Sequence, residues 1–329
     1  MLRDTNQIEE KMAHMIETMA YVGAKPWHGL GAELNSSQPI EVWAQQAGLD
    51  WTICETPVCF SSGKQAVPES MHQFLENKVL YRSDTNAALS VVGQRYKVVQ
   101  PGEILEFYRD LTELSGFELE TAGVLRGGRK IWALARTGQS TAIKGSDISN
   151  GYVLLATACD GTLATTAQFT SVRVVCNNTL AIALGGREKA VKVPHRTAFD
   201  PVAVKRQLGI SVSAWDSFMY NMKGLSERKV NDADVSRFLR QVFSDESKEV
   251  PVFNERAAAA TKLLFDGAGR GAELQSAKGT SFGLLNSVTE FVDHMRRARG
   301  ADYRLESAWF GQGALLKQKA LDQSLAMIA

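Results

Sequence analysis

The stretch that decides the fold covers residues 152–184 and reads YVLLATACDGTLATTAQFTSVRVVCNNTLAIAL. It opens with an apolar run, followed by Asp160-Gly161, a dipeptide typical of hairpin turns. Residues 162–175 are rich in Thr and Val, which suit a pleated, half-buried strand. Two asparagines then offer a helix N-cap, and the apolar residues after them predict a helix over 178–184. We therefore expect a strand, a tight turn, a second strand and a capped helix.

The rest of the chain predicts an α+β protein, with a central twisted antiparallel β-sheet backed by helices and a helical C-terminal part. Short extended segments separated by turn residues follow one another over 51–99, as in an antiparallel meander. Pro101 begins an amphipathic segment that predicts a helix over 101–114. The Gly-, Ser- and Thr-rich residues 137–151 predict a loop.

Three domains are predicted from these patterns. They are an N-terminal arm with a PWHGLG turn (1–50), an antiparallel sheet domain with helices 101–114 and 178–184 (51–200), and a helical part (201–329). Beyond Asp200 the hydrophobic periodicity is helical. The helices predicted there are 201–225, 231–244, 252–265, 281–298 and 313–327.

Composition excludes several classes of protein. The chain has 37 Lys and Arg against 36 Asp and Glu, and 44% of its residues are hydrophobic, as in an ordinary globular protein. No apolar run approaches the roughly 20 residues of a membrane span, and the charged N-terminus lacks the apolar core of a signal peptide. The four cysteines form no C-x-x-C pair and the five histidines are scattered. We therefore expect a cytoplasmic protein with no metal, cofactor or membrane partner.

Catalytic motifs are also missing from the sequence. It has no G-x-S-x-G elbow, H-E-x-x-H motif, Walker loop or dinucleotide fingerprint, and the GAGRG segment at 267–271 lacks the spacing of a phosphate-binding loop. Cys176 follows Arg173 by three residues, which favours a thiolate, but this spacing is common by chance. The absence of a catalytic set favours a binding protein over an enzyme.

Positive charge is concentrated in the middle of the chain. Residues 117–210 carry 12 Lys and Arg against 6 Asp and Glu, whereas residues 1–116 carry 9 against 15. This basic segment favours an anionic partner, unless the acidic N-terminal part covers it within the molecule. The glycines between Arg126 and Arg129 would let a phosphate approach the backbone, although a solvated hairpin tip explains them equally well. The candidate phosphate-binding residues are Arg126, Arg129, Lys130, Arg173, Lys192, Arg196, Lys205 and Arg206.

Aromatic residues provide candidates for stacking on nucleic-acid bases. These candidates are Trp27, Tyr152 and Phe169. Trp27 is equally suited to anchoring the N-terminal arm on the core. Another aromatic pair, Trp309 and Phe310, lies between two predicted helices, and we expect at least one of these side chains to be buried.

Arg173 occupies an unusual position, because strand alternation places it on the face opposite Val172 and Val174. A charge in the middle of a sheet is either paired or faces a ligand. One hypothesis is an ion pair with Glu118 or Glu120 on a neighbouring strand. The other is contact with phosphate through the planar guanidinium fork.

Four segments resemble a known protein family. They are PWHGLG (26–31), YKVVQPGEILEFYRDL (96–111), FTSVRVVCNNTLAIAL (169–184) and SAWFGQGALLKQKAL (307–321). Over nearly the whole chain the sequence is similar to the phage- and plasmid-associated proteins grouped as domain of unknown function 932. The resemblance implies a mobile-element protein, whose relatives often lie beside DNA recombination or replication genes, and it brings no catalytic residues.

The predicted order of elements over 101–185 is helix, four strands and helix, similar to the core of single-strand annealing proteins of the Rad52 type. Such proteins hold single-stranded nucleic acid in a cationic groove and commonly form rings. By this analogy we expect a homo-oligomer that binds single-stranded DNA without sequence specificity and anneals complementary strands in phage or plasmid recombination. The alternative is a host-directed protein-interaction factor of a phage or plasmid, with an anti-defence or regulatory role and no catalytic activity.

Overall fold

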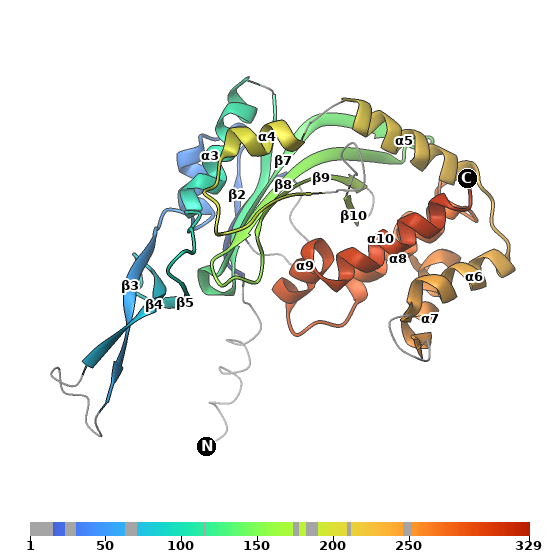
Figure 1. Cartoon of the computed structure of the whole chain (residues 1–329). Coiled ribbons are helices and arrows are strands. Elements are labelled where there is room, and N and C mark those ends of the chain that lie inside the picture. The colour runs from blue at the N-terminus through green and yellow to red at the C-terminus, as the bar shows by residue number, and fades with distance from the viewer. Residues whose placement is uncertain are drawn as a thin grey trace, which may run out of the picture. The chain divides into compact units, whose positions relative to one another are not determined.

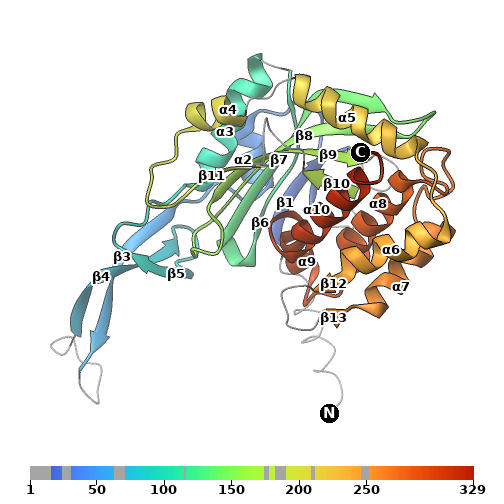
Figure 2. The same cartoon turned by 45° about the vertical axis from the view of Figure 1, so that its right-hand side comes forward.

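The chain folds into two compact units, each assembled from separate pieces of sequence, and Figures 1 and 2 show two views of this computed structural model. The first unit takes residues 1–136, 153–168 and 190–208, and the second unit takes 137–152, 169–189 and 209–329. The described residues are 16–23, 31–62, 71–114, 116–173, 178–181, 190–208, 212–245 and 252–329.

A mixed β-sheet forms the centre of the fold. In the order of their hydrogen bonding, its strands are β10 (Asn178–Ala181), β9 (Thr165–Arg173), β8 (Ile148–Ala158), β7 (Lys130–Ala142), β6 (Glu118–Leu125), β1 (Ile16–Val22) and β2 (Ala32–Leu34), and β11 (Val191–Val193) pairs with β9. β1 and β2 run parallel, whereas the pairs β1–β6, β6–β7, β9–β10 and β9–β11 are antiparallel. The predicted α+β class with a central sheet is confirmed, with one parallel pair that the sequence did not indicate.

The connection between β7 and β8 is much shorter than predicted. A loop over 137–151 is wrong, because β7 continues to Ala142 and β8 begins at Ile148. The turn between them is closed by the backbone N–H of Ile143, which donates to the carbonyl oxygen of Asp147 at 2.8 Å. Residues 136–142 alternate between exposed and half-buried, so their Ser and Thr side chains follow a strand period that their loop-like composition conceals.

The connection between β8 and β9 is wider than the predicted two-residue turn and covers residues 159–164. The Asp160 carboxylate accepts hydrogen bonds from the backbone N–H of Thr162 at 3.0 Å and from its hydroxyl at 2.6 Å. Gly161 has a φ of +75°, which glycine adopts without steric cost. The Asp-Gly pair therefore bends the chain as predicted, within a longer loop.

The chain after β9 forms a strand, so the predicted helix over 178–184 is wrong. Asn178–Ala181 pair antiparallel with β9 as β10, and the hydroxyl of Thr170 donates to the carbonyl oxygen of Leu180 at 3.0 Å. Residues 182–184 lie outside the described residues. A short apolar run suits either a helix or a strand, and the backbone partners along β9 decide between them.

A three-stranded antiparallel ribbon belongs to the first unit. Its strands are β3 (Ile53–Ser61), β4 (Met71–Arg82) and β5 (Ala88–Gly93), in that order. β5 pairs only with Asn77–Tyr81 of β4, and β3 and β4 extend together beyond it (Figures 1 and 2). In this outer part Phe60, Phe74 and Leu75 are 50%, 44% and 73% exposed. The ribbon is therefore an arm with uncovered apolar side chains.

The helices of the first unit are arranged around buried aromatic side chains. Its described helices are α2 (Ile40–Gln46), α3 (Pro101–Leu114) and α4 (Pro201–Leu208), so the predicted helix 101–114 is confirmed. Tyr108 of α3 is fully buried. Its hydroxyl lies 2.8 Å from the carbonyl oxygen of Ala133 in β7 and 3.1 Å from that of Val153 in β8. This phenol joins α3 to the sheet.

Helices make up most of the second unit, which confirms the predicted helical C-terminal part. They are α5 (Val212–Glu227), α6 (Asp232–Phe243), α7 (Glu255–Leu263), α8 (Ser281–Glu290), α9 (Ala301–Phe310) and α10 (Gln312–Leu325), with π-helical turns η3 (Leu264–Ala268) and η4 (Phe291–Met295) and the small hairpin β12 (Ser244–Asp245) and β13 (Val252–Phe253). α10 packs against α6, α8 and α9. Over the described residues, no helix combines the length and apolarity that crossing a membrane requires.

Two predictions about the C-terminal part of the chain need correction. The single helix predicted over 201–225 is divided into α4 and α5. Trp309 and Phe310 lie inside α9 and are both half-buried, so the expectation that one of them would be buried is wrong. Their rings meet edge to face with centroids 6.2 Å apart, so part of the apolar surface of each ring is covered by the other.

A buried ion pair joins α10 to η4. Nζ of Lys317 lies 2.7 Å from Oδ1 of Asp293, and the two side chains are only 5% and 8% exposed. Buried charges are tolerated when they are paired and hydrogen-bonded. This contact fixes the last helix against the π-helical turn that follows α8.

Candidate nucleic-acid interface

Four segments of the first unit meet at one end of the central sheet. They are residues 94–97 after β5, the β6–β7 turn at 126–129 with its 3-10 helix η2 (Arg126–Gly128), the β8–β9 connection at 159–164, and residues 194–196 after β11, and we call this surface the turn end. Figures 1 and 2 show the β6–β7 turn beside the β8–β9 connection. The backbone N–H of Cys159 donates to the carbonyl oxygen of Arg129 at 2.9 Å, and the hydroxyl of Tyr96 donates to that of Ala158 at 2.7 Å.

His195 connects three of these segments. Its ring stacks on Tyr96, with centroids 4.4 Å apart and an interplanar angle of 17°. Nδ1 lies 3.1 Å from the carbonyl oxygen of Lys97, and Nε2 lies 3.0 Å from that of Leu163. A ring that carries a proton on both nitrogens can donate to both oxygens, whereas the neutral ring donates only once.

Cys159 and Tyr96 hold the turn end together. Burial, reinforced by the nearby Asp160 carboxylate, raises the pKa of the Cys159 thiol to about 12. Burial also raises the pKa of the Tyr96 phenol. At neutral pH the thiol is therefore protonated and poorly suited to act as a nucleophile. Its Sγ lies 3.8 Å from the carbonyl oxygen of Gly128, which is a packing contact in the β6–β7 turn.

The turn end carries exposed positive charge. Arg95, Lys97, Arg129 and Arg196 are all exposed, and none of the four forms an ion pair within the described part of the chain. Asp160 is the one carboxylate in the sequence of the four segments. The local charge is therefore positive, with cations contributed from three different segments.

The predicted cations do not all belong to this surface. Arg126 and Arg129 lie in the β6–β7 turn, and Arg196 lies after β11, so the structure brings these three to the turn end. Lys192 is exposed on β11, opposite Thr166 of β9. The sequence did not single out Arg95 and Lys97. Their only signal was the alternation of cation, Tyr and cation after a glycine turn, within a segment whose pattern predicts extended backbone.

Two other predicted cations are less available to a ligand. Lys130, the first residue of β7, is only 4% exposed, so burial removes it from the candidate set. Nζ of Lys205 lies 3.1 Å from Oδ2 of Asp110 and 5.3 Å from the ring centroid of Phe107. Its neighbour Arg206 on α4 is exposed.

The predicted stacking residues are placed in the core where the structure describes them. Tyr152 is 3% exposed, and Phe169 is fully buried with its ring centroid 6.0 Å from that of Trp215. Neither ring presents a free face to a base. Trp27 and the side chain of Arg173 lie outside the described residues.

The carboxylates proposed as partners of Arg173 lie on β6, beside Arg136 of β7. The carboxylate of Glu120 accepts hydrogen bonds from Nε of Arg136 at 3.1 Å and from its Nη2 at 2.5 Å. In the register of the sheet, Arg136 also lies opposite Glu118. Arg136 therefore lies beside both carboxylates that were proposed as partners of Arg173, and the two hypotheses for Arg173 stay predictions because its side chain lies outside the described residues.

The carboxylates of the acidic N-terminal segment could neutralise the cations of the basic middle within the molecule. The structure shows such pairing for only some of these cations. Lys205 is paired with Asp110 from the acidic segment 1–116. At the turn end, Arg129 and Arg196 have no such partner among the described residues, and the same holds for Lys192 on β11 and Arg206 on α4. Carboxylates of the acidic segment therefore cover only part of the basic middle.

Comparison with known proteins assigns the family. The model of the family described as domain of unknown function (DUF932) matches residues 88–309. The chain belongs to this family. Nothing among curated proteins or solved structures matches this DUF932 protein. The matched range contains all four segments of the turn end, but the family description states no activity. The likeness to annealing proteins of the Rad52 type stays a prediction.

Proposed function

We propose that this DUF932 protein binds single-stranded nucleic acid, DNA above all, without sequence specificity through the turn end. The observation that carries the proposal is the convergence of Arg95, Lys97, Arg129 and Arg196, without a carboxylate partner among the described residues, on one surface. Phosphate suits this set, because guanidinium groups present planar forks of donors to its oxygens and a lysine adds a compact charge.

Recognition of the phosphate backbone fits this surface better than base stacking. Tyr152 and Phe169 are buried, and one face of Tyr96 is already covered by His195. Binding dominated by phosphate contacts is independent of sequence and strongly dependent on salt. It also leaves the base edges free to pair. We therefore extend the proposal to annealing of complementary strands by a cytoplasmic homo-oligomer during recombination of phage or plasmid DNA.

Salt titration tests the proposal. Fluorescence anisotropy of a labelled oligo-dT of about 20 nucleotides should show binding at low salt. Neutralising four phosphates should give a slope of about −3 in a plot of log affinity against log salt. A variant with Gln at the four turn-end cations should bind at least ten times more weakly, with a flatter slope. Absence of binding by the wild-type protein at low salt would refute the proposal.

A matched control separates the turn end from general charge effects. The control variant also loses four exposed cations, but from the helices and turns of the second unit. Its substitutions are Lys223→Gln, Arg240→Gln, Arg270→Gln and Arg299→Gln, at cations that, like those of the turn end, form no ion pair among the described residues. It should retain wild-type affinity and slope, apart from a small change from net charge. Equal losses in both variants would show that the turn end is not the binding surface.

A second candidate function is supported by the ribbon arm. Phe60 and Phe74 are exposed on one face of the outer part of β3 and β4, where Phe60 lies opposite His72 and Phe74 lies opposite Val58. Exposed apolar side chains that share a surface are typical of protein-interaction sites. This observation fits the host-directed interaction factor that the sequence left open. Capture of a specific host protein by the wild type, but not by a Phe60→Ser and Phe74→Ser variant that binds oligonucleotide normally, would favour this function.

A further inference from the structure

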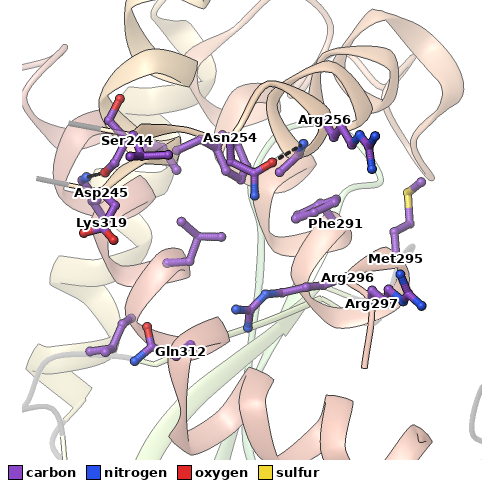
Figure 3. A pocket seen from close by; sticks show the side chains of 16 residues that line it. Ser244, Asp245, Asn254, Arg256, Phe291, Met295, Arg296, Arg297, Gln312 and Lys319 are labelled. Carbon is purple, nitrogen blue, oxygen red and sulfur yellow. Dashed lines mark hydrogen bonds between the residues drawn. The ribbon is translucent and has the colours of Figure 1, made fainter. Parts of the chain in front are cut away.

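A second candidate binding site lies within the second unit. A cavity of about 820 Å³ opens among the end of α6, the hairpin β12–β13, the start of α7, η4 and α10, and Figure 3 shows its lining. Small-molecule sites commonly have volumes of roughly 300–1,000 Å³. The turn end contributes no residue to this lining.

The cavity has an apolar wall with an aromatic centre. Phe291 of η4 meets Phe243 of α6 edge to face, with ring centroids 5.7 Å apart. Val242 lies beside Phe243 at the end of α6, and Leu315 and Leu316 of α10 complete this wall. Leu315 is 63% exposed, so an uncovered apolar surface is available to a ligand.

Positive charge predominates among the lining residues. The lining has four cations, Arg256, Arg296, Arg297 and Lys319, and one carboxylate, that of Asp245. Lys319 donates from Nζ to the carbonyl oxygen of Ser244 at 2.9 Å. Arg256 and Arg297 are exposed and form no ion pair within the described residues. The lining therefore combines an apolar surface with a strong excess of positive charge.

Arg296 is the most constrained of these cations. It is half-buried, and Nη1 donates to the hydroxyl of Ser307 at 2.7 Å, a hydroxyl that also accepts from the backbone N–H of Gly313 at 3.2 Å. Figure 3 shows its side chain reaching across the cavity toward Gln312. In the described residues its guanidinium has no carboxylate partner. A half-buried charge that is positioned but not neutralised indicates an anionic ligand.

The backbone at this point is also unusual. η4 is a π-helical turn that ends directly before Arg296, and such turns occur frequently at functional sites. It contributes Phe291 and Met295 to the lining. The π-helical turn η4 therefore contributes part of the apolar lining and is followed directly by Arg296.

We propose that this cavity binds a small phosphorylated ligand of the nucleotide class. Arg296 and the exposed Arg256 and Arg297 contact its phosphates, and the base packs against Phe291. The lining also includes the exposed side-chain amides of Asn254 and Gln312, groups that can hydrogen-bond the edge of a base. Oδ1 of Asn254 already accepts from the backbone N–H of Ala257 at 3.1 Å as the N-cap of α7, so Asn254 offers a base its amide N–H groups.

Isothermal titration calorimetry with the full-length protein tests the site. ADP should bind, whereas adenosine and pyrophosphate, which each keep one half of the ligand, should bind at least ten times more weakly. Arg296→Gln and Arg297→Gln should each weaken ADP binding about tenfold or more, because each removes a charge-assisted hydrogen bond. Arg297→Gln is the safer variant for folding, because Arg297 is exposed and forms no ion pair among the described residues.

The control is Arg299→Gln, which removes an exposed guanidinium three residues from Arg296 and outside the lining. It should leave ADP affinity unchanged. Absence of ADP binding, unchanged affinity in both Arg296→Gln and Arg297→Gln, or preference for decanoate over ADP would overturn the proposal. The variant with Gln at the four turn-end cations should bind ADP like the wild type, so failure of oligonucleotide binding and failure of ADP binding remain distinguishable.

Discussion

Replacing Lys317 with Met tests how the last helix of the second unit is held. In the native protein its Nζ lies 2.7 Å from Oδ1 of Asp293, and both side chains are nearly inaccessible to solvent. The substitution keeps the aliphatic part of the side chain but removes the ammonium that neutralises a buried carboxylate. Removing one partner of a buried ion pair costs about 3–5 kcal/mol. This is a large part of the roughly 5–15 kcal/mol by which a folded domain is stable.

The double variant Asp293→Leu with Lys317→Met separates the charge from the packing. Both charges are then absent and the volume is nearly preserved, so its free energy of unfolding should return to within about 2 kcal/mol of the wild type. An exposed pair provides the control. Lys278 lies 2.5 Å from Glu273, and their side chains are 68% and 65% exposed. Lys278→Met should therefore cost less than about 1 kcal/mol.

The free energies are measured by urea unfolding at 25 °C, with circular dichroism and tryptophan fluorescence as independent probes. Coincident transitions are required before the values are compared, because the chain has two units. A loss below about 1 kcal/mol for Lys317→Met would refute the reasoning. A double variant as unstable as the single one would refute it as well, since packing and not charge would then explain the loss.

Three further predictions concern stability. Trp43→Ala should lower the free energy of unfolding in urea by about 3–5 kcal/mol, because Trp43 is 1% exposed. Trp309→Ala should lower it clearly less, because Trp309 is half-buried. Equal losses in the two variants would contradict this difference in burial. Burial raises the pKa of Tyr96, so above pH about 10 the unfolded chain ionises first and stability falls as pH rises. Between pH 9 and 11 this fall should be shallower in Tyr96→Phe, and an identical slope would exclude Tyr96 as its source. Gly128→Ala, where φ is +99° and a Cβ would lie 2.9 Å from the Trp51 ring, should lower the melting temperature more than Gly161→Ala, which meets nothing within 4 Å.

The elements predicted correctly are those whose conformation is decided by residues that are close to one another in the sequence. Pro101 and the helical spacing after it gave both ends of α3 correctly. The strand over 178–181 was missed, because pairing along β9 decides it and no local pattern reports that pairing. Tyr152 was a candidate for base stacking, but β8 is buried on both faces from Gly151 onward, and the sequence of the strand alone does not show what covers each face.

The candidate site could be predicted only in part, because it also depends on contacts between residues that are far apart in the sequence. The excess of Lys and Arg over 117–210 pointed to the region that contains Arg129 and Arg196. It could not show that Lys130 is buried while its neighbour Arg129 is exposed. Nor could it show that Arg95, from the acidic part of the chain, belongs to the same surface. Such convergence depends on contacts between residues far apart in sequence, such as Cys159 with Arg129.

The interleaving of the two units has a consequence for the order in which the chain is synthesised. The boundaries fall after residues 136, 152, 168, 189 and 208, so the chain passes from one unit to the other at each of these points. A ribosome must therefore release residue 208 before the first unit has all its parts, and residues 137–152 and 169–189 emerge long before the rest of the second unit. A nascent chain stopped at Arg136 would contain β6 but only part of β7. Five of the eight strands of the central sheet, β1, β2, β6, β7 and β8, are complete by Ala158, within the first half of the chain. The last piece of the first unit is complete only at Leu208, when nearly two thirds of the protein has been made.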